Sequence, residues 1–166
     1  LFCGDLIGSH RQACDAYSIG HTIDLAEKRD LVIASCGGFP YDIDLIQAHK
    51  TIHAASHACR EGGTMVILAE CDDGPGRADI LNWFEANDSQ DLARMLCEKY
   101  QVNGQTAWSL LNIAERFDVR LVTALNTQKI ETTRMRRYES LAAALVGIED
   151  RRGYILPYGA RSRIVN

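Results

Sequence analysis

The sequence lacks any apolar run long enough to cross a membrane. Its longest runs, such as Met65-Val66-Ile67-Leu68-Ala69, are far shorter than the roughly 20 apolar residues that a spanning helix needs. Proline is scarce, with 3 residues in 166, while 46% of the residues are hydrophobic and 24% are charged. This composition excludes a disordered or low-complexity chain and predicts one globular domain with a sizeable core.

The cysteine spacings of zinc sites are also missing. The chain has 6 cysteines, but no C-x-x-C pair and no Cys/His cluster with zinc-finger spacing. Cys36 and Cys71 each end an apolar run, where a free cysteine behaves as a small hydrophobic residue. We therefore expect reduced thiols in a cytoplasmic protein.

Charge of one sign is not concentrated along the chain. The formal net charge is −4 with acidic and basic residues interspersed, which argues against a nucleic-acid partner because such a partner needs a concentrated basic face. The exception is the cluster of Arg134, Arg136 and Arg137, which Glu131 and Glu139 flank. We predict that this cluster is a solvated helix face, with a phosphate-contact patch as the alternative.

Apolar runs of strand length alternate with helix-compatible stretches along the chain. Such alternation with short turns predicts right-handed βαβ units and a mainly parallel sheet. The fold class is therefore α/β, a three-layer Rossmann-like sandwich formed by a single domain over residues 1–166. The expected strands are 31–36, 64–70, 120–125 and 154–156, and the expected helices are 41–60, 80–86, 89–99, 105–116 and 138–147.

The turn after the first of these strands is the most informative segment, because ligands bind beyond the carboxyl ends of parallel strands. Gly37 and Gly38 permit a tight reversal and a close backbone approach to a ligand. Pro40 is expected at the first helical turn, with Asp42 and Asp44 satisfying the helix dipole. A nucleotide phosphate is excluded, since neither G-x-G-x-x-G nor the P-loop pattern is present. The alternative is an ordinary helix start with favourable charges.

The helix that follows this turn has two different faces. Successive residues of a helix are rotated by about 100°. This rotation places Leu45, Ala48, Ile52, Ala55 and Cys59 on one apolar face. The opposite face contains His49, Lys50, His53 and His57, with Gln47 at its edge. Histidines spaced i, i+4 and i+8 could bind a metal, but no acid or cysteine of this helix joins them. A solvated face is the favoured interpretation.

Gln47 and Lys50 are neighbours at i, i+3 on the surface of this helix. An amide donor beside an ammonium suits a small carboxylate or a polarised C–O group. On the residues alone, an ordinary surface pair remains the alternative.

Residues 37–45, read as Gly-Gly-Phe-Pro-Tyr-Asp-Ile-Asp-Leu and followed by Gln47 and Lys50, resemble the hallmark segment of the nickel-dependent lactate racemases. Residues 62–71 with Gly74 are similar to that family's next strand and acidic loop, and residues 155–159 to its terminal strand and turn. The chain opens with Leu1 instead of methionine, in what looks like the end of a strand. We expect the C-terminal domain of a longer two-domain enzyme.

The resemblance implies an isomerase that racemises or epimerises small 2-hydroxy acids by reversible hydride transfer to a nickel-pincer nucleotide. It places the cofactor's lysine tether, its nickel-coordinating histidine and the two base histidines in an N-terminal domain. The expected partners are a 2-hydroxy acid and that domain of the same chain, with no nucleic acid and no membrane. This chain is expected to hold no metal and no cofactor by itself, and to be inactive alone.

The resemblance also assigns the residues of the site. The family's substrate-facing glutamine falls on Gln47 and its lysine on Lys50, which is the expected catalytic residue. Gly37, Gly38, Pro40 and Asp42 are expected to shape the loop. Ile46 stands where lactate-active members often carry an aromatic residue, so a bulkier or different hydroxy acid is an open possibility. The alternative function is a non-catalytic small-molecule-binding or regulatory domain of the same fold.

Overall fold

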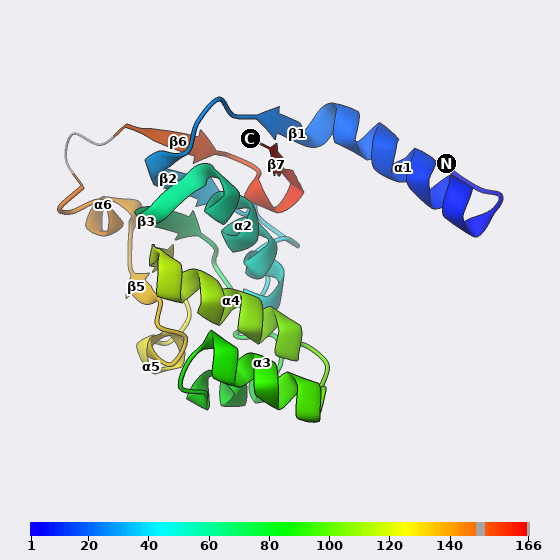
Figure 1. The fold of residues 1–166 in the computed structure, drawn as a ribbon. Helices are drawn as coiled ribbons and strands as arrows, with labels where there is room; N and C mark the ends of the chain where they lie inside the picture. The colour runs from blue at the N-terminus through cyan, green and yellow to red at the C-terminus, as the bar shows by residue number, and fades with distance from the viewer. Residues whose placement is uncertain (149–151, 166) are drawn as a thin grey trace.

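A five-stranded parallel sheet forms the centre of the molecule, as the sequence predicts (Figure 1). The computed structural model describes residues 1–148 and 152–165, and its strand order is β5-β4-β3-β2-β6. A separate parallel pair joins β1 and β7. The elements in chain order are α1 (Leu6–His21), β1 (Thr22–Asp24), β2 (Arg29–Ser35), α2 (Leu45–Ala58), β3 (Cys59–Leu68), η1 (Ala78–Glu85), α3 (Ser89–Glu98), α4 (Gly104–Arg116), β4 (Asp118–Val122), α5 (Thr127–Glu131), β5 (Arg136–Tyr138), α6 (Leu141–Ala144), β6 (Gly153–Leu156), η2 (Gly159–Arg161) and β7 (Arg163–Val165).

Helices cover both faces of the sheet. On one face α2 and α4 bury the larger core, which includes the strand residues Val32 and Ile67 and the predicted apolar face of α2. On the other face, the short α6 covers a smaller core that contains Leu31 and Val66. Because successive residues of a strand point to opposite faces, β2 and β3 are apolar on both parities. This arrangement confirms the predicted α/β class.

Several predicted boundaries are wrong. Residues 1–5 are not the end of a strand, because the Asp5 side chain accepts a hydrogen bond from the Gly8 N–H and begins α1. The stretch predicted as one helix over 138–147 begins with the last residue of β5, Tyr138, and contains only the short helix α6. The cluster of basic residues is therefore not a helix face, since Arg136 and Arg137 belong to β5, and Arg134 pairs with Glu115.

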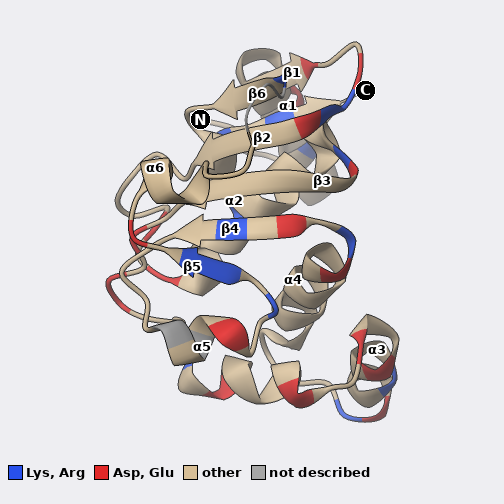
Figure 2. Cartoon of the chain, turned by 90° about the vertical axis from the view of Figure 1, so that its left-hand side faces the viewer, with Lys and Arg blue, Asp and Glu red and all other residues tan. Residues whose placement is uncertain are grey.

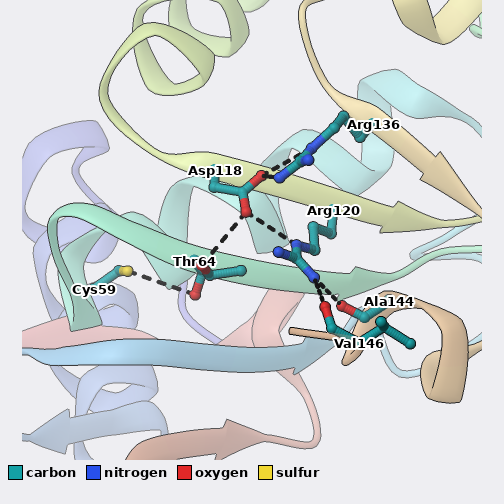
Figure 3. Close-up of polar contacts among 7 residues, drawn as sticks. All are labelled: Cys59, Thr64, Asp118, Arg120, Arg136, Ala144 and Val146. Carbon is teal, nitrogen blue, oxygen red and sulfur yellow. Dashed lines mark hydrogen bonds and ion pairs between the residues drawn. The ribbon is translucent and has the colours of Figure 1, made fainter. Parts of the chain in front are cut away.

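Asp118 organises the edge of the sheet where β4 begins (Figure 3). Its carboxylate accepts hydrogen bonds from Arg136 of β5 and, at 2.9 Å, from the Arg120 Nε. Arg120 in turn donates to the carbonyl oxygens of Ala144 and Val146 at 2.7 and 2.9 Å, which satisfies the end of α6. Burial would raise the pKa of Asp118, but the hydrogen bonds from Arg136 and Arg120 outweigh it and hold the pKa below its ordinary value.

Charges of both signs are mixed over the face shown in Figure 2. All 6 cysteines are free thiols, as expected from the sequence. Over the described residues, none of the helices has the length and apolar character needed to span a bilayer.

Replacing Ile67 tests the central strand. Ile67 lies in β3 and is 0% exposed, so Ile67→Ala removes a buried side chain and leaves a cavity that costs about 2–5 kcal/mol of the free energy of unfolding. Chemical denaturation measures this loss. The control is Ile155→Ala, because Ile155 is 73% exposed and its truncation should cost far less. Equal losses for the two variants would contradict the assignment of β3 to the core.

Candidate functional site

The loop between β2 and α2 forms the rim of the candidate site. Gly37 and Gly38 have φ values of +93° and +80°, the left-handed region that favours glycine, so the predicted tight reversal is present. A Cβ on Gly37 would lie 3.0 Å from the Tyr158 ring. This glycine therefore allows the turn after β6 to pack directly against the loop.

A second loop, which follows β3, is hydrogen-bonded to the first along the backbone. The Cys71 N–H donates to the Asp42 carbonyl oxygen at 2.7 Å, and the Asp73 N–H donates to the Ile43 carbonyl oxygen at 2.9 Å. The Leu45 N–H then donates to the Gly74 carbonyl oxygen at 3.2 Å. The two loops therefore form one continuous rim beyond β2 and β3.

Gly76 lets the second loop approach the start of α2. Its φ is +88°, and a Cβ at this position would lie 2.9 Å from both the Asp44 carboxylate and the Ile46 side chain. Ile46, the residue that departs from the family pattern, is half-buried and packs against the core. Its side chain is thus fixed from two directions.

The helix begins later than predicted, at Leu45. Asp44 is its N-cap: its backbone is extended and its Oδ1 accepts a hydrogen bond of 2.6 Å from the Gln47 N–H. Pro40 and Asp42 are therefore not in the first helical turn. The Phe39–Pro40 peptide bond is cis, and both Pro40 and Asp42 lie in the turn that precedes the helix.

Gln47 and Lys50 contact each other on the first turns of α2. The Lys50 Nζ donates a hydrogen bond of 2.6 Å to the Gln47 Oε1. Gln47 is half-buried and Lys50 is exposed. With its oxygen engaged by the ammonium, the Gln47 amide keeps its NH₂ group as a donor, so the amide and the ammonium can both donate to a ligand.

Two cavities open along the rim, of about 600 and 360 Å³. Gly38, Asp42 and Glu70 line both of them. Neither cavity is lined by Gln47 or Lys50, nor by Gly37 or Pro40. The structure thus places the predicted loop residues Gly38 and Asp42 in the same cavities as Glu70. It places Gln47 and Lys50 on the adjacent surface of α2.

The larger cavity includes residues that the sequence did not assign to this site. Thr123, Arg137 and Glu139 come from the ends of β4 and β5. The available signal was their position at strand ends: Thr123 and Glu139 directly follow β4 and β5, and Arg137 lies one residue before the end of β5. It could be used only once β5 was known to be a strand, because ligand-binding residues in parallel sheets follow the strand ends.

The buried cysteines of the rim are not nucleophiles. Burial raises the pKa of the Cys36 thiol to about 11 and that of the Cys71 thiol to about 12. At these pKa values both thiols remain protonated near neutral pH. They are therefore unreactive, because the thiolate is the reactive form. They pack as small apolar residues, as the sequence predicts.

The three histidines of α2 do not converge on one point. The His49 Nε2 lies 2.9 Å from the Ser109 hydroxyl oxygen of α4, whereas the Nε2 atoms of His53 and His57 lie 3.3 Å apart. No group of three or more potential metal ligands occurs within residues 1–148 and 152–165. His53 and His57 are exposed, as the prediction of a solvated face requires. His49 instead contacts Ser109 of α4 and lies between the two helices.

Loops that follow neighbouring parallel strands and carry polar groups define an open-sheet α/β domain of the ligand-binding class. Within that class the chain belongs to the lactate racemase C-terminal domain family, whose family model matches residues 25–154.

Individual relatives agree with this assignment. The chain is 35% identical over 99 residues to the lactate racemase of Thermoanaerobacterium thermosaccharolyticum, covering 59% of this chain and 23% of that protein. It is 33% identical over 75 residues to the lactate racemase of Lactiplantibacillus plantarum, covering 45% and 18%. These matches reach only about a quarter or less of the curated relatives.

Solved structures resemble the chain over nearly its whole length. The lactate racemase apoprotein from T. thermosaccharolyticum superposes with a TM-score of 0.86 at 28% identity, over 95% of this chain and 40% of that chain. A protein from Thermotoga maritima superposes with a TM-score of 0.63 at 14% identity, over 96% and 42%. The second likeness shows the fold alone.

His49 should make the stability of the domain depend on pH. Burial, with smaller contributions from His53 and Lys50, lowers the pKa of His49 from 6.5 to about 4. Between these values the unfolded chain binds the proton and the folded chain does not, so the free energy of unfolding falls as the pH drops from 6.5 to 4 and is unaffected by this group above 6.5. The contribution is roughly 1–3 kcal/mol.

His49→Gln keeps a hydrogen-bonding group beside Ser109 but removes the titration. Its free energy of unfolding, measured by denaturation at several pH values, should fall less steeply than that of the parent between pH 6.5 and 4. Identical slopes for parent and variant would show that His49 does not titrate as described.

Proposed function

We propose that this chain is the C-terminal, substrate-contacting domain of a racemase or epimerase of small 2-hydroxy acids. The observation that carries the proposal is the Gln47–Lys50 pair, held at 2.6 Å on the helix that leaves the rim of the sheet. Membership of the lactate racemase C-terminal domain family supports it. The remainder of the enzyme would be a longer N-terminal part of the same protein.

The pair is chemically suited to a 2-hydroxy acid. Removal of the hydride from C2 and of the proton from the hydroxyl group, which the resemblance assigns to the base histidines of the N-terminal part, turns the alcohol into a carbonyl group whose oxygen only accepts hydrogen bonds. The Lys50 ammonium and the Gln47 NH₂ group are both donors, so they can bind this oxygen and the neighbouring carboxylate. Fixed donors aimed at developing charge stabilise a transition state. Removing one such donor typically costs a few kcal/mol, which lowers the rate by about 10²–10³.

The start of α2 keeps the pair in position. Asp44 caps the helix through the Gln47 backbone N–H, which leaves the Gln47 side chain available for substrate. Lys50 lies one turn farther on. The helix is capped and packed against the sheet, so the side chains that it carries have the rigid support that a site needs.

The family resemblance implies a nickel-pincer nucleotide, which supplies a hydride acceptor when bound. The described residues of this chain do not offer it a ligand set, because no group of three or more potential metal ligands occurs among them and His49 is engaged with Ser109. We therefore assign its binding to the remainder of the protein. The role of this chain is to bind and polarise the substrate.

Ile46 bears on the choice of substrate. It is the residue before Gln47, and it is held between the core and the backbone of Gly76. An aliphatic side chain here offers the substrate no hydroxyl or ring. We propose that the preferred hydroxy acid differs from that of members with an aromatic residue at this position.

Lys50→Ala in the full-length protein should reduce turnover at least tenfold, because the ammonium that stabilises the C2 oxygen is lost. The measurement is the rate of interconversion of L- and D-2-hydroxy acids. Lys50 is exposed, so the melting temperature should change little.

The matched control is His53→Ala, which truncates an exposed residue on the same helix one turn farther along. It should leave turnover near that of the parent. An unchanged rate for Lys50→Ala would remove Lys50 from the site and favour a binding or regulatory domain without catalysis.

The chain alone should purify without stoichiometric nickel and show no racemisation. Metal analysis of the purified chain checks this. One nickel per chain would contradict the assignment of the cofactor to the remainder of the protein.

A further inference from the structure

The sheet reverses its strand order next to β2. The chain lays down β2, β3, β4 and β5 in one direction and then returns to place β6 on the opposite side of β2. In open α/β sheets, the crevice at such a reversal, outside the carboxyl ends of the strands, is where ligands bind. Here the crevice lies between the loop after β2 and the turn 157–162 after β6, which ends beside α2 in Figure 1. The same turn also borders a further cavity that the loop after β2 does not line.

Arg161 joins these two segments. Its guanidinium carbon lies 4.8 Å from the centroid of the Tyr158 ring and 5.4 Å from that of the Tyr41 ring. Its backbone is fixed as well, since the Tyr17 hydroxyl donates a hydrogen bond of 3.0 Å to its carbonyl oxygen. Contacts to aromatic faces hold a guanidinium without using its in-plane N–H donors.

Those donors have no carboxylate partner within the described parts of the chain. Several other arginines, such as Arg77, Arg116 and Arg136, each pair with an acid. Arg161 is therefore an exposed cation that lies over two tyrosine rings and whose N–H donors no described carboxylate takes up.

A cavity of about 350 Å³ lies against this arginine. It is lined by Gly20, His21 and Ile23 at the end of α1 and in β1, and by residues of the turn 157–162 that include Arg161. None of the described lining residues is acidic. The two rim cavities, in contrast, contain Asp42 and Glu70.

We propose that this cavity binds a small ligand that carries a carboxylate or a phosphate, with the Arg161 guanidinium donating to its oxygens. A planar guanidinium matches both groups by paired N–H···O bonds. Ile23 and Pro157, which also line the cavity, would contact the apolar part of the ligand. The site is independent of Gln47 and Lys50, and it does not rest on the proposed racemase role.

The direct test follows the ¹⁵N resonance of the Arg161 Nε in the whole chain while inorganic phosphate or, separately, L-lactate is added. The expected result is a saturable shift with at least one of the two. A response to phosphate alone assigns a phosphorylated ligand, and a response to lactate alone assigns a carboxylate. No shift with either anion up to about 50 mM, a range in which even millimolar binding would be visible, overturns the proposal.

Substitution gives the second test. Arg161→Gln should weaken the binding of the responding anion at least tenfold, because the charge and the paired donors are both lost. The control is Arg163→Gln, two residues along, where the side chain donates to the Ser18 hydroxyl instead; it should keep the parent affinity. Equal affinities for parent and Arg161→Gln would overturn the proposal. If Arg161→Gln fails to fold, Arg161→Lys replaces it, with the loss of paired donors again expected to weaken binding.

Discussion

Backbone hydrogen bonds between the loops that follow β2 and β3 are the constraint on which the candidate site depends. They run from Cys71 to Asp42, from Asp73 to Ile43 and from Leu45 to Gly74. Parallel strands bring their carboxyl ends to one edge, and these bonds fix the two loops relative to each other. The start of α2, and with it the glutamine and the lysine, is placed by backbone atoms from two segments of the chain.

The two ends of the parallel strands, the amino end and the carboxyl end, are stabilised in different ways. At the amino end, where β4 begins, Asp118 and its two arginines compensate each other's charge and tie β4, β5 and α6 together. At the carboxyl end, the acidic residues Asp42 and Glu70 face cavities, and Arg161 is held by tyrosine rings. Satisfied charges support the fold, whereas uncommitted ones are available to ligands.

The sequence predicted those elements whose signal is local. Apolar runs on both parities identified β2 and β3, and helical spacing placed Gln47 next to Lys50. The strand β5 was missed because Arg136 and Arg137 are polar, and because Asp118, the partner of Arg136, lies 18 residues away in the sequence. The start of α2 was placed too early because Asp44, which the helix could have included, caps it instead. Thr123 and Arg137 reach the cavity through strand order, which no local pattern encodes.

Gly76 links the shape of the site to a segment that carries none of the proposed substrate contacts. Any larger side chain there would press on Asp44 and Ile46, and so displace the cap that sets the orientation of α2. Exchanging the hallmark loop between relatives, in order to alter substrate preference, would therefore succeed only if residues 71–76 were transplanted together with it. The two stretches are therefore coupled structurally despite their separation in the sequence.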